Sequence, residues 1–257
     1  MLALVLVVSA GVSAQQTTSL DRKLTDILNR MECKDAAKRQ AAFDDLFNFW
    51  PEGIDAGLAQ HPDEAERVKL ALIRLLRTEN SALQAARPGS KSEDYGEYVF
   101  SLTQTVSAMK DDRAIPVLVE ATPRSGVDLV QFGDKALEPV LGQLKNSDAL
   151  VRARALEIGL RILQSKSDPA PRARARALVL SSLNDQSMVV RSAAIRAIDC
   201  LDDRQEYVPT LEKMAKTEPE KLPGKALDGG DSQEFYPVRY DARRVLRDIQ
   251  NNKTCQH

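Results

Sequence analysis

The sequence predicts an all-α fold, an α-solenoid of antiparallel helix pairs with an N-terminal helical layer. The first observation is a phrase of valine and arginine followed by alanine, which recurs at Val151-Arg152, Val190-Arg191 and Val238-Arg239. The second is an acidic residue followed by proline, from Asp112 to Pro116, Asp134 to Pro139 and Asp203 to Pro209. The phrases alternate at a period of roughly 40 residues, which is typical of stacked helix pairs. The third is an aromatic content of only 5%, which suits small-residue helix packing better than sheets.

The composition limits the classes of partner. A chain of 257 residues with 43% hydrophobic and 28% charged residues can bury a sizeable core. The net charge is −1 and the sequence pI is about 6.2. This net charge therefore provides no long-range electrostatic attraction to nucleic acid or to an anionic membrane.

Residues 1–14 read MLALVLVVSAGVSA, and no Lys or Arg precedes the apolar run. A run of Leu and Val followed by small residues is typical of a secretory signal, with cleavage expected after Ala14. The run is too short to cross a bilayer, which needs about 20 residues. We therefore expect an exported protein, periplasmic or secreted, with no membrane span in the mature chain. The alternative is an apolar N-terminal helix that stays on the protein.

Residues 19–86 are expected to form the N-terminal helical layer, either as degenerate repeats or as a cap on the solenoid. Ser19 can cap a first helix that continues to Met31, and apolar spacing predicts a second helix from Ala36 to Trp50. Pro62 opens a third helix at a position where its missing N–H costs nothing. The segment 87–90, Arg-Pro-Gly-Ser, is the clearest internal boundary.

Residues 92–250 are expected to form the repeats. In each acid-to-proline phrase the acidic residue is expected to cap a helix and the proline to lie in its first turn. The helix between Gly126 and Phe132 is short, so one repeat is clipped. An insertion at about 217–236 precedes the last repeat helix, and loops of this length are more often functional or disordered than neutral.

The phrases resemble HEAT repeats, in particular the short HEAT-like repeats also found in phycobilisome lyases. Asp185 through Ile198 is similar to the first helix of such a repeat, and Asp112 through Leu118 to the opening of the second. The resemblance covers residues 92–250 and implies a scaffold. HEAT-like repeats serve lyases, DNA glycosylases, phosphatase scaffolds and transport adaptors, so the function does not follow from the fold.

The chain has three cysteines and two histidines. In an exported chain Cys200 and Cys255 can form a disulfide, or Cys200 is buried as a thiol and Cys255 is free. A zinc site is not expected with so few ligands. No catalytic motif occurs, so we expect no enzyme activity and no cofactor.

Arginines make residues 148–200 locally basic, which permits two interpretations. They can present a face to nucleic-acid phosphates, or they can pair with Asp148, Asp185 and Asp199 between stacked helices. The structural interpretation is favoured, because each arginine that follows a buried valine is part of the repeat phrase. No nucleic-acid partner is therefore expected.

The leading hypothesis is an exported, non-enzymatic scaffold that binds a protein or peptide on its concave face. The resemblance implies that the second helix of each pair lines that face. The candidate partner-binding residues are Glu120, Gln143, Glu212, Lys213, Phe235 and Tyr236. The two aromatic residues have an alternative role, which is to pin the insertion onto the last helix. The alternative functions are a lyase-like enzyme or enzyme accessory, and nucleic-acid binding through the arginine-rich face.

Overall fold

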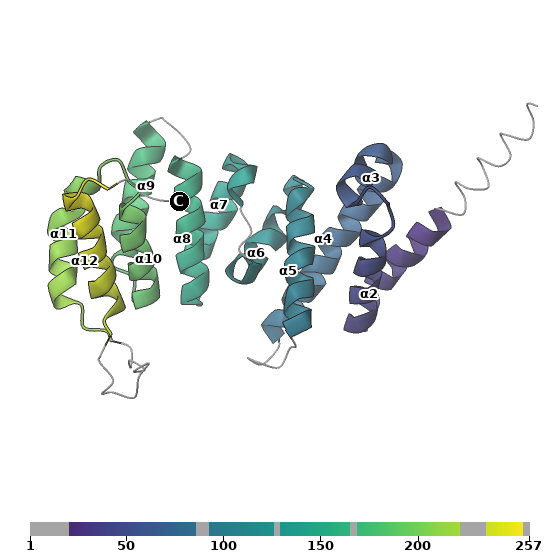
Figure 1. Ribbon diagram of the computed structural model, residues 1–257, viewed down its shortest axis with the longest axis horizontal. Helices are drawn as coiled ribbons and strands as arrows, with labels where there is room; N and C mark the ends of the chain where they lie inside the picture. The colour runs from purple at the N-terminus through teal and green to yellow at the C-terminus, as the bar shows by residue number, and fades with distance from the viewer. Residues whose placement is uncertain (1–20, 86–92, 126–128, 165–168, 222–234, 254–257) are drawn as a thin grey trace, which may run out of the picture. The chain divides into compact units, whose positions relative to one another are not determined.

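The structure is a computed structural model that describes residues 21–85, 93–125, 129–164, 169–221 and 235–253 (Figure 1). In these ranges the chain forms α-helices and short 3₁₀ helices joined by turns, with no β-strand. The all-α class is therefore confirmed. The chain divides into two compact units, Met1–Val127 and Asp128–His257, which are described in turn.

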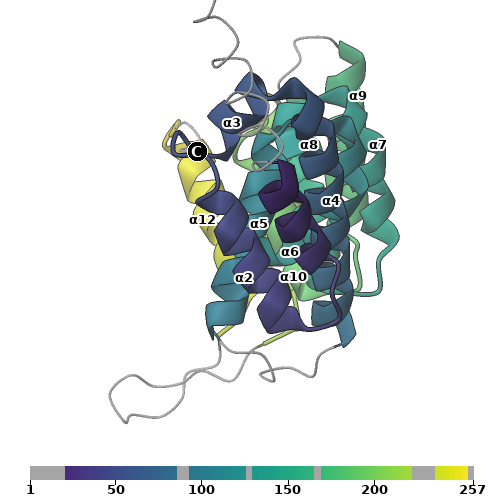
Figure 2. The same ribbon diagram turned by 90° about the vertical axis from the view of Figure 1, so that its right-hand side faces the viewer.

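The first unit is organised around one long helix, α4, which packs against α3, α5 and α6 (Figures 1 and 2). A helix over residues 21–31 opens the described part of this unit, with Leu24, Ile27, Leu28 and Met31 buried as its apolar spacing predicts. The remaining helices are α2 (Ala36–Phe47), α3 (Ile54–Gln60), α4 (Pro62–Ala85), α5 (Glu93–Ala108), η1 (Asp112–Ala114) and α6 (Ile115–Ser125).

The segment around Trp50 differs from its prediction. The helix α2 ends at Phe47, so Trp50 lies in the following turn rather than in the helix. A further helix, α3, begins directly after Gly53, whose φ of 91° is accessible mainly to glycine. Pro51 and Gly53 predict the end of α2, but the same residues also allow a new helix to start. The Trp50 ring is buried against α3 at Gly57.

Replacing Gly57 by alanine is expected to destabilise the protein by about 1–3 kcal/mol, because overpacking a filled core forces side chains out of their rotamers. A Cβ at Gly57 would lie 2.2 Å from Cδ2 of the Trp50 indole. The matched control is Gly96→Ala in α5, where a Cβ meets nothing within 4 Å. This control is expected to gain up to about 1 kcal/mol from helix propensity. Urea unfolding measures both changes, and equal effects would contradict the prediction.

The second unit is built on α8, which packs against α7, α9 and α10, and on α12, which packs against α10 and α11 (Figure 1). Its elements are η2 (Leu129–Phe132), α7 (Asp134–Gly142), η3 (Gln143–Lys145), α8 (Ala149–Gln164), α9 (Pro169–Ser182), α10 (Met188–Ile198), η4 (Arg204–Tyr207), α11 (Val208–Thr217) and α12 (Pro237–Gln250).

The acid-to-proline phrases behave as predicted only in part. Pro116 and Pro209 are each the second residue of their helix, in the first turn. Pro139 lies in the interior of α7, so its predicted first-turn position is wrong. The predicted caps are also wrong at Asp134 and Asp203: Gly133 is the N-cap of α7, and Asp203 precedes η4 without a side-chain capping bond. A 3₁₀ turn before α11 moves the acidic residue one turn ahead of the α-helix.

Candidate functional site

The repeat arginines hold helices together in the second unit. The guanidinium of Arg152 donates through Nε and Nη2 to the two carboxylate oxygens of Asp185, at 3.0 and 2.8 Å. Its Nη1 donates to the carbonyl oxygens of Asn146 and Ser147, at 2.9 and 3.0 Å. The hydrogen bond from Arg152 holds the pKa of Asp185 below its ordinary value. Arg152 therefore links the loop before α8 to Asp185, which lies in the loop before α10.

The same arrangement recurs twice among the described residues. Arg191 donates through Nη1 to the carbonyl oxygens five and six residues earlier, and through Nη2 to Glu218 at 2.8 Å. Arg39 in α2 likewise binds the carbonyls five and six residues earlier, and its Nε donates to Glu79 at 2.6 Å. The N-terminal helical layer thus contains the arginine arrangement of the later repeats.

Further arginines of residues 148–200 also pair with carboxylates. The pairs are Arg154–Glu157, Arg172–Asp202, Arg174–Glu138, Arg176–Glu206 and Arg196–Asp241. Much of the positive charge that suggested a nucleic-acid face is therefore balanced locally. These contacts support the structural interpretation of the arginines.

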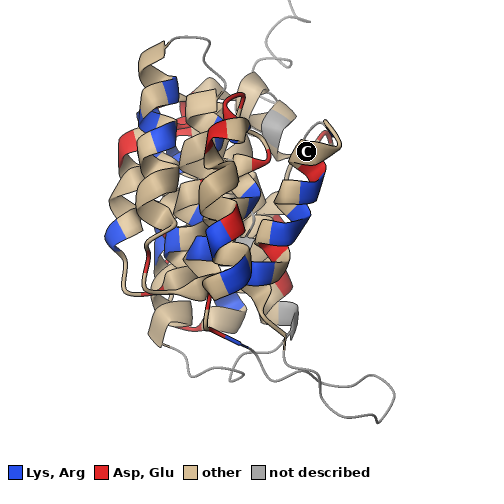
Figure 3. Cartoon of the chain, turned by 90° about the vertical axis from the view of Figure 1, so that its left-hand side faces the viewer, with Lys and Arg blue, Asp and Glu red and all other residues tan. Residues whose placement is uncertain are grey.

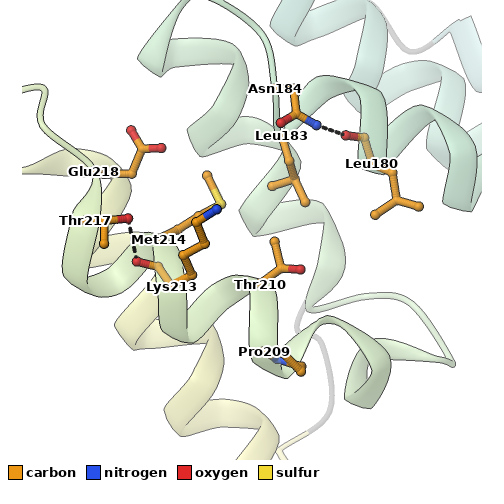
Figure 4. Close-up of a pocket in the computed structure, with 9 residues that line it drawn as sticks. All are labelled: Leu180, Leu183, Asn184, Pro209, Thr210, Lys213, Met214, Thr217 and Glu218. Atoms are coloured by element: carbon orange, nitrogen blue, oxygen red, sulfur yellow. Dashed lines mark hydrogen bonds between the residues drawn. The ribbon is translucent and has the colours of Figure 1, made fainter.

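A groove of about 450 Å³ lies between α9 and α11 (Figure 4). We call it the α9–α11 groove. Its lining residues are Leu180, Leu183, Asn184, Pro209, Thr210, Lys213, Met214, Thr217 and Glu218. Leu180 and Leu183 come from the α9 side, across from Met214 on α11. The Leu180 side chain is 43% exposed, so the groove offers apolar surface to a ligand.

The polar groups of the groove differ in how far they are already engaged. The amide of Asn184 donates to the carbonyl of Leu180, and the hydroxyl of Thr217 donates to the carbonyl of Lys213. Glu218 accepts from Arg191. The exposed ammonium of Lys213 forms no ion pair with any described carboxylate. The groove therefore has a mixed apolar and polar lining, together with one lysine that has no carboxylate partner among the described residues.

A second cleft of about 470 Å³ runs along α12. We call its lining the arginine–aromatic stripe. It consists of Phe235, Tyr236, Arg239, Tyr240, Arg243 and Arg247. Basic residues follow the helix that leads to the C-terminal mark in Figure 3. Phe235 and Tyr240 are 44% and 55% exposed, and Arg239 lies 4.2 Å above the Tyr236 ring centroid. The cleft therefore combines exposed rings with guanidinium groups.

The structure distributes the six predicted partner-binding residues over several places. Lys213 lines the α9–α11 groove, and Phe235 and Tyr236 belong to the arginine–aromatic stripe. Glu212 is exposed on α11 but lines neither cleft. The remaining two residues are Gln143, which is half-buried in η3 and accepts from Asn146, and Glu120, which is exposed on α6 of the first unit.

The other predicted sites fall partly outside the described residues. Cys33 is a free thiol and Cys200 is disulfide-bonded. Cys255 lies outside the described residues, so the pairing of Cys200 with Cys255 stays a prediction. The predicted signal segment and its cleavage point after Ala14 also lie outside them. Within the described ranges, no three His, Cys, Asp or Glu side chains gather as metal ligands.

Comparison with family models, with curated proteins and with solved structures finds no match for the chain. Among the described residues, no helix has both the length and the apolar character that crossing a membrane requires. The assignment of a function therefore rests on the geometry of the clefts.

Proposed function

We propose that the chain is an exported, non-enzymatic α-solenoid scaffold of HEAT-like repeats that binds a peptide segment of a protein partner. The observation that carries the proposal is the α9–α11 groove, which is lined by the exposed Leu180 and by Lys213, a lysine that forms no ion pair with a described carboxylate. A volume of about 450 Å³ is within the usual size of a ligand cleft. Apolar residues such as Leu180 and Met214 next to polar ones are typical of a protein interface.

The arrangement of helices supports a solenoid. In the second unit, α8 packs against α7, α9 and α10, and α12 packs against α10 and α11, so α8, α10 and α12 follow one another in a row. The groove residues lie on or beside α9 and α11, which we assign as the second helices of successive repeats because they follow α8 and α10 in the chain. This is the position at which HEAT-like repeats are expected to present their binding face.

The groove also indicates the chemistry of its ligand. An aliphatic or aromatic side chain can cover Leu180 and Met214 and remove their apolar surface from water. A carboxylate next to that side chain can pair with Lys213. We therefore propose a peptide that carries an apolar residue beside an acidic one.

Neither alternative function has comparable support. Arginines expected to face nucleic acid pair with carboxylates, as in Arg152–Asp185 and Arg191–Glu218. An enzyme site would bring several ionisable groups together in one pocket. The described lining of the α9–α11 groove has one lysine and one glutamate, and Arg191 already engages that glutamate.

Selection of peptides from a random library on the purified protein tests the proposal. Peptides with an apolar residue beside an acidic one are expected to be enriched. Leu180→Asp and Lys213→Glu are each expected to weaken their binding by about tenfold, because each removes an apolar or charge-assisted contact. The matched control is Leu150→Asp, since Leu150 is an exposed leucine on α8 outside the groove. Equal loss in the control, or no loss at Leu180, would reject the groove as the site.

A further inference from the structure

The arginine–aromatic stripe carries positive charge that no carboxylate of the described residues balances. No described carboxylate forms an ion pair with Arg239, Arg243 or Arg247, and none lines the cleft. This contrasts with the carboxylates of the same helix, which are engaged by other groups. Asp241 accepts from Ser192 and Arg196, and Asp248 pairs with Arg244 and Lys253. The stripe therefore presents three guanidinium groups whose counter-charge is not supplied by the described residues.

Two of these arginines are held in place by backbone bonds. Arg239 donates from Nε to the carbonyl of Glu218 at 2.6 Å, while its guanidinium covers the Tyr236 ring. Arg243 donates from Nη2 to the carbonyl of Ala215 at 3.3 Å. A guanidinium has five N–H donors, so each bond leaves most of the donor capacity for a ligand. Because these side chains are already oriented, a ligand has less side-chain entropy to overcome.

The spacing of the arginines indicates the shape of the ligand. Positions 239, 243 and 247 are four residues apart on one helix. At a rise of about 1.5 Å per residue, their side chains begin about 6 Å apart along one face of α12. In an extended peptide, alternate side chains lie on the same side at intervals of about 6.5 Å. Carboxylates at alternate positions of an extended peptide therefore match the three arginines.

We propose that the arginine–aromatic stripe is a second binding site, separate from the α9–α11 groove, for an extended acidic peptide segment. The segment carries Asp or Glu at alternate positions, which pair with Arg239, Arg243 and Arg247. An apolar residue at one end covers the exposed rings of Phe235 and Tyr240.

The rings favour a peptide over a nucleic acid. Single-stranded nucleic acid is held by aromatic side chains that offer their faces for base stacking. One face of Tyr236 is covered by Arg239, and the rings of Phe235 and Tyr240 are tilted by 56° to each other. The whole chain also has a net charge of −1, so it lacks the basic character of most nucleic-acid-binding proteins.

The test uses the purified protein and fluorescence anisotropy with a labelled peptide of alternating sequence, Leu followed by three Glu-Ser units. Binding is expected, and it is expected to be lost when the three Glu are replaced by Gln. A peptide of the same composition with the three Glu adjacent is expected to bind several-fold more weakly. Arg247→Gln is expected to weaken binding of the alternating peptide about fivefold, and Arg243→Gln with Arg247→Gln about 25-fold.

Arg172→Gln is the matched control, because it removes the same charge from an exposed arginine on α9 outside both clefts. It is expected to leave binding unchanged. The proposal is overturned if Arg172→Gln weakens binding as much as Arg247→Gln, if the Gln peptide binds equally well, or if no binding occurs. Tighter binding of a dodecamer of thymidine nucleotides would also overturn it in favour of a nucleic-acid site. Leu180→Asp is expected to have no effect here, so failure at one site is distinguishable from failure at the other.

Discussion

Replacing Arg39 by methionine is expected to lower the free energy of unfolding by about 3–5 kcal/mol, because it leaves a buried charge without its partner. The side chain of Glu79 is fully buried, and it accepts from Arg39 Nε and Nη2 at 2.6 and 3.2 Å. The hydroxyls of Tyr95 and Tyr98 also donate to this carboxylate. Burial, together with the neighbouring Glu79, raises the pKa of both tyrosines, so both hydroxyls stay protonated as donors.

Two further variants distinguish the effect of an unpaired buried charge on stability from the effect of removing any arginine. Arg30→Met removes a more exposed partner of Asp45 and is expected to cost less than about 1 kcal/mol. The double variant Arg39→Met with Glu79→Leu removes the unpaired charge but also takes the acceptor from the Tyr95 and Tyr98 hydroxyls, so it is expected to recover only part of the loss. Urea unfolding of the three variants measures these differences. If Arg39→Met costs no more than Arg30→Met, the buried pair does not stabilise the first unit.

Arg152→Lys is expected to lower the free energy of unfolding by about 2–4 kcal/mol, although it conserves the charge. The planar guanidinium of Arg152 bonds two carboxylate oxygens of Asp185 and two carbonyls at once, which an ammonium cannot reproduce. A hydrogen bond to a charged group contributes about 1.5–3 kcal/mol, and the lysine cannot keep all four of these bonds. Arg154→Lys is the control two residues away, because Arg154 is half-exposed and, among the described residues, bonds Glu157 alone. It is expected to change stability by less than about 0.5 kcal/mol.

The same pair also predicts a pH dependence. The pKa of Asp185 is lowered in the folded protein, chiefly by its hydrogen bond from Arg152. The stability from this pair is therefore fully present above the ordinary carboxyl pKa of about 3.8 and is lost as the pH falls through the lowered value. The difference between wild type and Arg152→Lys is expected to shrink as the pH falls below about 4. A difference that stays constant down to pH 2 would contradict this role of Asp185.

Local patterns predicted the helices better than the clefts. The Val-Arg phrase located α8, α10 and α12, although Val151 is half-buried whereas Val190 and Val238 are buried. It missed the related helix α2, where Lys38 replaces the valine before Arg39. A search for a capping residue four positions before an arginine would have identified α2 as a related helix. Asp35 precedes Arg39 as Asp148 precedes Arg152 and Ser187 precedes Arg191, and each caps its helix.

The clefts depend on packing between distant segments, and the sequence carried less information about them. Leu180 is 43% exposed on α9, and the sequence does not show that α11 places Lys213 in the same groove. Met214 likewise contributes to that groove from a separate helix. The arginines of the stripe were not predicted as a site, because the sequence does not show that Asp241 and Asp248 on the same helix pair with Arg196 and Arg244 instead.

The bond from Arg239 to the carbonyl of Glu218 has a consequence for how the chain can vary in length. Arg39, Arg152 and Arg191 each bind carbonyls five and six residues earlier, which fixes the number of residues in the preceding loop. Arg239 instead binds a carbonyl 21 positions earlier. Its bond joins the two ends of the intervening segment directly and sets no limit on the residues between them. This position is therefore the natural place to introduce an affinity tag, a fluorescent protein or a foreign epitope without changing how α11 and α12 pack.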